Sequence, residues 1–342
     1  MTTFIVVGDI HWSGRTPMAR ADHFPTAMAA KLREVHNIAR EFSAAAILQP
    51  GDMTDSIGIG YGAFQDLAKV IGESPCPWIS IPGNHDREGG NPATDLRSPW
   101  GALVATDVMQ EASGQCYPAS QKGSAIVVTG HGYDHETDID KNQYGRDQNI
   151  WALVDGDPLS GANDHNISIH LAHGMLLKAA PGIDSMRHTL VSEIAELPNA
   201  PDVLICGHYH LPLGIIRVGK TMIINPGALC RLSAHIEEIE RTVQVAILQI
   251  GDGGWIDAEL RPIQCAQPGN VVLSRQHIEE AADRELRLTR FLDLLQGEQE
   301  QRQTDLVGMI DDIGKRELLP EVVKAEALRR LAAAQETLAV AG

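Results

Sequence analysis

The chain has 342 residues, a hydrophobic fraction of 43% and a formal net charge of −17 at pH 7. These values allow a sizeable core in one large domain with an appendage, or in two domains, and they exclude wholesale disorder. The acidity argues against a protein that coats nucleic acid, because such binding depends on Lys and Arg. Five widely spaced cysteines without a C-x-x-C pair, and an N-terminus without a signal-peptide pattern, predict a cytoplasmic protein. No apolar run reaches the roughly 20 residues of a membrane helix.

Short apolar runs that end near Gly or Asn recur as far as residue 250, and they are typical of strands buried on both faces. They cover residues 4–7, 45–48, 78–81, 125–128, 167–171, 203–206, 222–224 and 243–250. Helical spacing of apolar residues lies between several of them, at 26–42, 61–71 and, more weakly, 184–196. Strands that alternate with helices predict an α/β layered domain.

The composition changes along the rest of the chain. Residues 86–122 hold a Gly/Pro/Asn-rich stretch and a short helical pattern, while the polar residues 131–166 predict long loops on the rim that carries the site. After about residue 270 the strand pattern stops. Three helices are then predicted, at 275–301, from Thr304 to Gly314, and from Pro320 onward. We therefore expect an α/β domain at 1–265 and a helical extension at 270–342.

Polar clusters follow five of the predicted strands. They are Asp9-Ile10-His11, Gly51-Asp52-Met53-Thr54-Asp55, Gly83-Asn84-His85-Asp86, His173-Gly174 and Gly207-His208-Tyr209-His210. Sites in α/β sheets lie beyond the carboxyl ends of strands, so these side chains should meet. Carboxylates, an amide and imidazoles suit two divalent cations such as Mn²⁺, Fe or Zn²⁺. Paired cations acidify a bridging water and hold phosphoryl oxygens, which predicts hydrolysis of a phosphate ester.

The ordered series D-x-H, G-D-x-x-D, G-N-H-D, H-G and G-H-x-H resembles the calcineurin-like metallophosphoesterases. The resemblance runs from Asp9 to His210 and implies a four-layer α/β/β/α sandwich. It also implies seven metal ligands. Asp9, His11 and His210 would bind one cation, Asn84, His173 and His208 the other, and Asp52 would bridge the two.

The resemblance further implies catalytic residues that bind no metal. His85 would lie over the scissile phosphate, as general acid to the leaving group or as a transition-state donor, while a bridging hydroxide attacks phosphorus. Asp55 resembles the carboxylate that orients this histidine in the family's phosphatases, and Asp86 is the rival for that role. At Ala228 the chain departs from relatives that often carry a serine there.

Within the family, residues 51–55 with the Gly/Tyr segment after them, residues 83–86 and the helical tail most resemble SbcD-type nuclease subunits. Those subunits cut DNA ends with manganese and work as dimers with an SMC-like ATPase. The resemblance therefore implies a DNA exonuclease or endonuclease of repair or recombination, a homodimer, an ATPase partner and no membrane. One alternative is a phosphodiesterase or phosphatase for small molecules such as cyclic nucleotides or dinucleotides, with a closed pocket in place of a long groove. Another is a scaffold that binds proteins, although all eight family positions are filled.

Four further residues near the clusters are candidates for the site, although each has an ordinary structural role as the alternative. His170 lies three residues before His173 in one predicted strand and therefore faces the other side, which favours a place in the core or behind the site. Three arginines adjoin the clusters and are candidate phosphate contacts, although surface arginine is the commoner outcome: Arg15, Arg87 and Arg231.

Overall fold

The computed structural model describes the chain except for residues 119–124, 152–165, 183–185, 275–305, 318 and 342. It forms two compact units, Met1–Arg275 and Gln276–Gly342. The first unit contains both sheets and all the predicted site residues. The described residues of the second unit are mainly helical.

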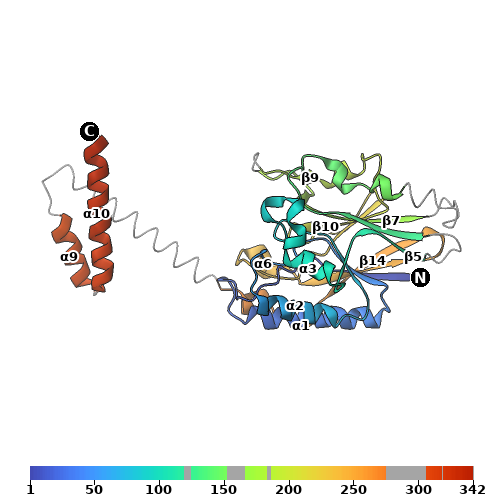
Figure 1. Cartoon of the computed structure of the whole chain (residues 1–342), viewed down its shortest axis with the longest axis horizontal. Coiled ribbons are helices and arrows are strands. Elements are labelled where there is room, and N and C mark those ends of the chain that lie inside the picture. Colours follow the sequence, from blue (N-terminus) through green and yellow to red (C-terminus); the bar gives the residue numbers. More distant parts are fainter. Residues whose placement is uncertain (119–124, 152–165, 183–185, 275–305, 318, 342) are drawn as a thin grey trace. The chain divides into compact units, whose positions relative to one another are not determined.

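Two six-stranded sheets, counted over the described residues, form the centre of the first unit (Figure 1). The first sheet has the order β14-β13-β1-β2-β3-β4, with strands β1 (Thr2–Val6), β2 (Ala46–Gln49), β3 (Trp78–Ser80), β4 (Gln110–Glu111), β13 (Gln244–Ile250) and β14 (Ile256–Pro262). Strands β1 to β4 are parallel, β13 pairs antiparallel with β1, and β14 pairs antiparallel with β13.

The second sheet has the order β11-β12-β10-β7-β6-β5. Its strands are β5 (Ser113–Pro118), β6 (Ala125–His131), β7 (Ile167–Gly174), β10 (Val203–His208), β11 (Gly214–Val218) and β12 (Thr221–Asn225). The four inner strands are parallel, and β5 and β11 close the two edges in antiparallel pairs. A short parallel pair, β8 (Leu176–Leu177) and β9 (Thr189–Leu190), follows β7.

Helices cover the outer faces of the sheets. The first sheet packs against α1 (Phe24–Glu41), α2 (Tyr61–Gly72) and α3 (Pro99–Ala105), and the second against the single turns η3 (Lys141–Tyr144) and α5 (Val191–Ile194). The remaining short helices are η1 (Glu88–Gly90), η2 (Pro92–Arg97), α6 (Ile236–Glu240), η4 (Asp252–Gly254) and α7 (Gly269–Val272).

Successive side chains along each strand point to opposite faces of the sheet and so contribute to two different layers of the core. In β1, Phe4 and Val6 pack between the two sheets, whereas Ile5 packs against the helices with Ile47 of β2. Because successive side chains point to opposite faces, a strand buried on both faces must be apolar throughout. A third apolar cluster, which includes Tyr144, lies outside the second sheet. The predicted four-layer α/β/β/α sandwich is thus confirmed.

The sequence pattern found the central strands and missed the edges. Strands β5, β11 and β14 were not predicted, because edge strands keep solvent-facing side chains and lack a continuous apolar run. The weak helical pattern at 184–196 yields one turn, Val191–Ile194, among the residues described there.

The second unit contains α9 (Leu306–Arg316) and α10 (Glu321–Ala341), which contact each other. Lys324 Nζ lies 3.4 Å from Asp311 Oδ1 and links the two helices. These helices occur where the patterns after Thr304 and Pro320 predict them, whereas the predicted helix at 275–301 lies outside the described residues. No helix in the described part of the chain is both long enough and apolar enough to span a bilayer.

Candidate metal centre

The carboxyl ends of five parallel strands bring the polar clusters together. Asp9, Asp52 and Asn84 follow β1, β2 and β3 of the first sheet, while His173 and His208 lie at the ends of β7 and β10 in the second. Residues up to 199 positions apart in sequence therefore contact one another.

A first donor set contains Asp9, His11, Asp52 and His210, whose ligand atoms all lie within 4.8 Å of one another. His11 Nε2 is 3.0 Å from His210 Nε2 and 3.3 Å from Asp52 Oδ2. His210 Nε2 is 3.5 Å from Asp9 Oδ2. Three of the four residues are almost fully buried, and His210 is partly exposed.

A second donor set contains Asp52, Asn84, His173 and His208. Ligand atoms of Asp52, His173 and His208 lie within 4.8 Å of one another. Asn84 Oδ1 is 3.0 Å from His173 Nε2 and 2.9 Å from His208 Nδ1. Asp52 belongs to both sets, which is the position required of a bridging carboxylate.

The hydrogen bonds and charges of these residues fit two divalent cations. His173 Nδ1 lies 2.7 Å from the Pro50 carbonyl oxygen, which can only accept, so Nδ1 carries a proton and Nε2 is the atom that faces Asp52 and Asn84. Burial raises the pKa of Asp9 to about 6. Burial also disfavours charged His173, yet Asp52 and Asp9 raise its pKa to about 9. Asp52 and Asp9 therefore favour positive charge at this centre, which bound cations would supply in place of the proton on His173.

The backbone at this centre is unusual. His11, Asp52 and His208 have positive φ angles of 46°, 56° and 79°. Residues other than glycine seldom adopt positive φ angles, and such strained backbone conformations cluster at functional sites. The His11 and Ile10 amides both donate to the Asp52 carbonyl oxygen, at 2.9 and 3.0 Å, and hold two of the turns together.

His85 is oriented differently from the sequence-based expectation. Its backbone amide donates to Asp52 Oδ1 at 2.9 Å, and its Nδ1 donates to the backbone carbonyl oxygen of Asp55 at 2.7 Å. The Asp55 carboxylate instead lies 3.6 Å from His11 Nδ1. The backbone of Asp55, and not its carboxylate, therefore orients the His85 ring and leaves Nε2 for a substrate.

Asp86 does not orient His85 either, and that prediction was wrong. Its fully buried carboxylate accepts hydrogen bonds from the amides of Met53, Thr54 and Gly83, and from Thr54 Oγ1, at 2.9–3.0 Å. It ties the turn after β2 to the turn after β3. Asp86 is thus a structural residue that fixes the distance between Asp52 and Asn84.

We expect Asp86→Ala to lower the free energy of unfolding by about 3 kcal/mol or more, because buried donors without partners cost about 1–3 kcal/mol each. Urea unfolding in the presence of a chelator measures this effect without any contribution from metal. The matched control is Asp257→Ala, an exposed carboxylate on β14, which should change little. Equal stability of the two variants would contradict the structural role.

Gly83 allows Asp52 to approach the turn after β3. A Cβ at Gly83 would lie 2.1 Å from Asp52 Oδ1 and 2.4 Å from the Asp52 amide nitrogen. Gly83→Ala should therefore displace the shared carboxylate and weaken metal binding by about tenfold or more, as loss of a supporting group does. Titration calorimetry with Mn²⁺ measures the affinity. Gly62→Ala on α2, where a Cβ meets nothing within 4 Å, is the control and should bind as the wild type.

Sequence reasoning missed Tyr133. Its ring centroid lies 5.8 Å from that of His208 and 6.2 Å from that of His173, so it covers the second donor set. Its loop also carries His131, which pairs with Asp134 at the surface. No spacing rule distinguished the tyrosine from its polar neighbours.

The other candidates have structural roles. His170 is buried, with Nδ1 2.8 Å from Thr129 Oγ1 and Nε2 2.8 Å from the Gln143 carbonyl oxygen, which confirms the prediction. Two of the arginines are not exposed to a substrate. Arg87 pairs with Asp95, and buried Arg231 donates to backbone carbonyl groups.

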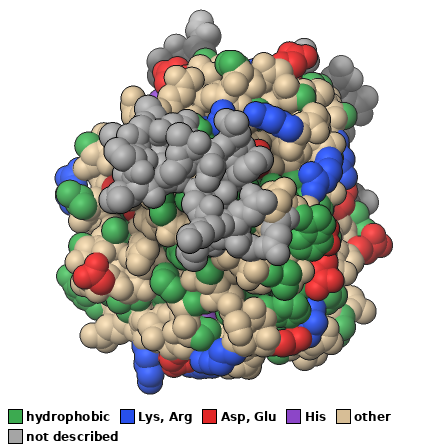
Figure 2. Space-filling model, turned by 90° about the vertical axis from the view of Figure 1, so that its right-hand side faces the viewer, with side chains coloured by type: hydrophobic (Ala, Val, Ile, Leu, Met, Phe, Trp, Pro, Cys, Tyr) green, Lys and Arg blue, Asp and Glu red, His purple; other side chains and the backbone are tan. Residues whose placement is uncertain are grey.

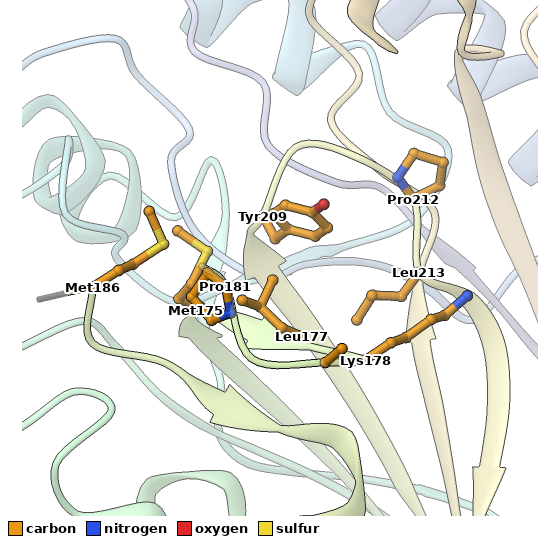
Figure 3. Close-up of a pocket in the computed structure, with 9 residues that line it drawn as sticks. Met175, Leu177, Lys178, Pro181, Met186, Tyr209, Pro212 and Leu213 are labelled. Atoms are coloured by element: carbon orange, nitrogen blue, oxygen red, sulfur yellow. The ribbon is translucent and has the colours of Figure 1, made fainter. Parts of the chain in front are cut away.

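A cavity of about 470 Å³ lies beside Tyr209 (Figure 3). In the sequence, Tyr209 stands between the two histidines of the last cluster. Its lining is mainly apolar, with one amino group: Met175, Leu177, Lys178, Ala179, Pro181, Met186, Tyr209, Pro212 and Leu213. Met175 follows His173 by two residues, so the cavity adjoins the metal centre along the chain.

A four-layer sandwich with two His/Asp donor sets that share one carboxylate is the arrangement of a metal-dependent phosphoesterase. The sequence profile described as calcineurin-like phosphoesterase matches residues 2–212, and the chain belongs to this family. Similar solved structures include the protein TT1561 of Thermus thermophilus, with 10% identity, a TM-score of 0.45, and coverage of 76% of this chain and 98% of that one. Another is a dimetal phosphatase from Danio rerio, with 11% identity, a TM-score of 0.46, and coverage of 76% and 96%. No curated protein matched the sequence.

Proposed function

We propose that the protein is a phosphodiesterase of this family and that its substrate is DNA, cut as an exonuclease or endonuclease of the SbcD type. The observation that carries the hydrolytic function is the pair of donor sets joined at Asp52, with His85 held beside them. Two divalent cations bound there would supply a hydroxide nucleophile and would neutralise charge on the phosphoryl oxygens.

The residues of the chain have separate roles in this proposal. Asp52 would hold both cations through one carboxylate, and its Oδ1 accepts a hydrogen bond from the backbone amide of His85. The Asp55 carbonyl fixes the Nδ1 proton of His85, so a charged ring can deliver the Nε2 proton to the leaving oxygen. Tyr133 covers the second donor set and limits access of water to that side.

The DNA assignment is supported by the order and spacing of the motifs and by the helical second unit. Leu319, Val322 and Val323 near the start of α10 are exposed, so this unit offers apolar side chains to another chain. We propose that residues 270–342 dock an SMC-like ATPase or a second copy, that manganese is the native metal, and that the protein is cytoplasmic. Figure 2 shows one face on which Lys/Arg and Asp/Glu side chains are interspersed.

A small-molecule phosphodiesterase is the second candidate, and the cavity beside Tyr209 favours it. About 470 Å³ is within the range of ligand pockets, roughly 300–1,000 Å³, and an apolar lining with one lysine suits a nucleobase with a phosphate. The strong negative charge of the chain also favours a small substrate over a polyanion.

One assay separates the candidates. Metal-stripped protein is reloaded with Mn²⁺ and tested on linear duplex DNA, single-stranded DNA, cyclic nucleotides and bis(p-nitrophenyl) phosphate. Degradation of DNA that disappears with Asp52→Asn supports the nuclease. Turnover of cyclic nucleotides without cleavage of DNA would replace it by the small-molecule enzyme. A protein that hydrolyses none of these would contradict both and favour the scaffold.

A further inference from the structure

A row of buried cations holds the segment 228–231 against the metal centre. The Leu229 amide donates to the Asp9 carbonyl oxygen at 2.9 Å, which ties the segment to the first donor set. On its other side, each of its four carbonyl groups accepts a hydrogen bond from a cationic side chain. Arg241 donates to Ala228 and Cys230, Lys31 to Leu229 at 2.7 Å, and Arg20 to Arg231 at 3.4 Å.

This clamp places a thiol at the centre. Cys230 is fully buried, and its Sγ lies within 4.8 Å of ring nitrogens of His11 and His210, which lie equally close to each other. Among the described residues, nothing accepts or donates a hydrogen bond at this thiol. By contrast, the thiol of Cys206, which is equally buried, contacts the carbonyl oxygens of Gly174 and Gly207 at 3.4 Å.

A metal ion bound at His11 and His210 would displace the proton of the Cys230 thiol. Burial raises the pKa of the thiol, while the charges of Arg241 and Lys31 act in the opposite direction. Lys31 is itself buried, and this burial lowers its pKa to about 7. The proposed hydrolysis uses neither Lys31 nor Cys230. Thiolates are soft donors that first-row metals such as Zn²⁺ bind strongly, so the sulfur of Cys230 adds a soft donor beside His11 and His210.

We propose that Cys230 is a further ligand of the first cation, together with His11 and His210, and that its sulfur makes this position selective for zinc, iron(II) or cobalt(II) over manganese or magnesium. Binding replaces the S–H bond by a sulfur–metal bond and releases one proton to solvent. The second donor set contains nitrogen and oxygen alone, so the manganese of the proposed function would occupy that set and a different metal would occupy the first. This inference rests on the metal centre of the proposed function.

Cobalt(II) tests the inference without an activity measurement. Metal-stripped full-length protein is titrated with Co²⁺, and absorption is recorded in the visible, where Co²⁺ itself absorbs, and in the near ultraviolet, where sulfur-to-cobalt charge transfer occurs. We expect the charge-transfer band in the wild type and in Cys206→Ala, and its loss in Cys230→Ala and Cys230→Ser. Competition between Zn²⁺ and Mn²⁺ at the first position should then shift toward Mn²⁺ by about tenfold or more in the Cys230 variants.

The result that overturns the inference is a wild-type protein that binds Co²⁺ with visible bands and no charge-transfer band, or a band that persists in Cys230→Ala. Either leaves the metal centre intact. Failure to bind Co²⁺ at all would instead remove the basis of the proposed function. X-ray absorption of the zinc-loaded wild type needs no variant, so it remains decisive if the Cys230 variants do not fold. A sulfur neighbour at about 2.3 Å supports the inference, and a shell of nitrogen and oxygen alone refutes it.

Discussion

Asp52→Asn should reduce phosphodiester hydrolysis by more than about a hundredfold and should lower the metal content below two ions per chain. Groups that merely support a metal ligand already change affinity by about 10–100-fold. Asp52 belongs to both donor sets, so its loss affects both positions. An amide of the same size offers one neutral oxygen, which cannot compensate the charge of two cations. Elemental analysis and the rate on bis(p-nitrophenyl) phosphate measure the two effects.

The matched control is Asp66→Asn, an exposed carboxylate on α2, which should keep both metals and the full rate. If the Asp52 variant retained two tightly bound ions and wild-type turnover, the role of this carboxylate as a ligand shared by both cations would be contradicted. Circular dichroism and thermal unfolding confirm that each variant is folded.

His85→Ala should keep both metals and lose about 10²–10⁴-fold in kcat, the usual contribution of a general acid. The loss should depend on the leaving group. A p-nitrophenolate leaves without protonation and should depend little on His85, whereas a nucleoside alkoxide needs the Nε2 proton. The ratio of the rates of DNA or dinucleotide cleavage to p-nitrophenyl ester cleavage should therefore fall sharply in the variant.

His235→Ala, an exposed histidine before α6, is the control and should leave this ratio unchanged. A uniform decrease for both kinds of substrate would indicate that His85 stabilises the phosphoryl group and does not donate a proton. A variant that keeps its metals and its full rate on nucleoside esters would eliminate any catalytic role for His85.

The sequence allowed prediction of the layers of the fold and the members of the site. Central strands such as β7 are buried on both faces, so their sequence is a nearly continuous apolar run that can be recognised without knowledge of the neighbouring strands. Edge strand β14 alternates with solvent-facing residues and was missed for that reason. The clusters around Asp9, Asp52 and His208 were recognisable because each follows a strand, and parallel strands place such turns at one edge.

Other parts of the site depend on contacts between residues far apart in sequence. Asp86 is adjacent to His85 in sequence, but its four hydrogen bonds run mainly to the turn 33 residues earlier. The backbone of Asp55 orients His85, and a carbonyl group is present at every position, so composition cannot single it out. Lys31 and Arg241 reach the segment 228–231 from elements that carry no motif.

By itself, the sequence determined the type of chemistry, because ligand atoms are properties of side chains and their order along alternating strands and helices is local information. The tertiary structure decided which atoms of those residues face each other. It brought the expected donors within 4.8 Å of one another around Asp52, changed the roles of Asp55 and Asp86, and placed Cys230 beside His11 and His210. These contacts form when two sheets pack face to face and the ends of their strands converge. The spacing of residues within one segment does not encode the distance between residues of different segments.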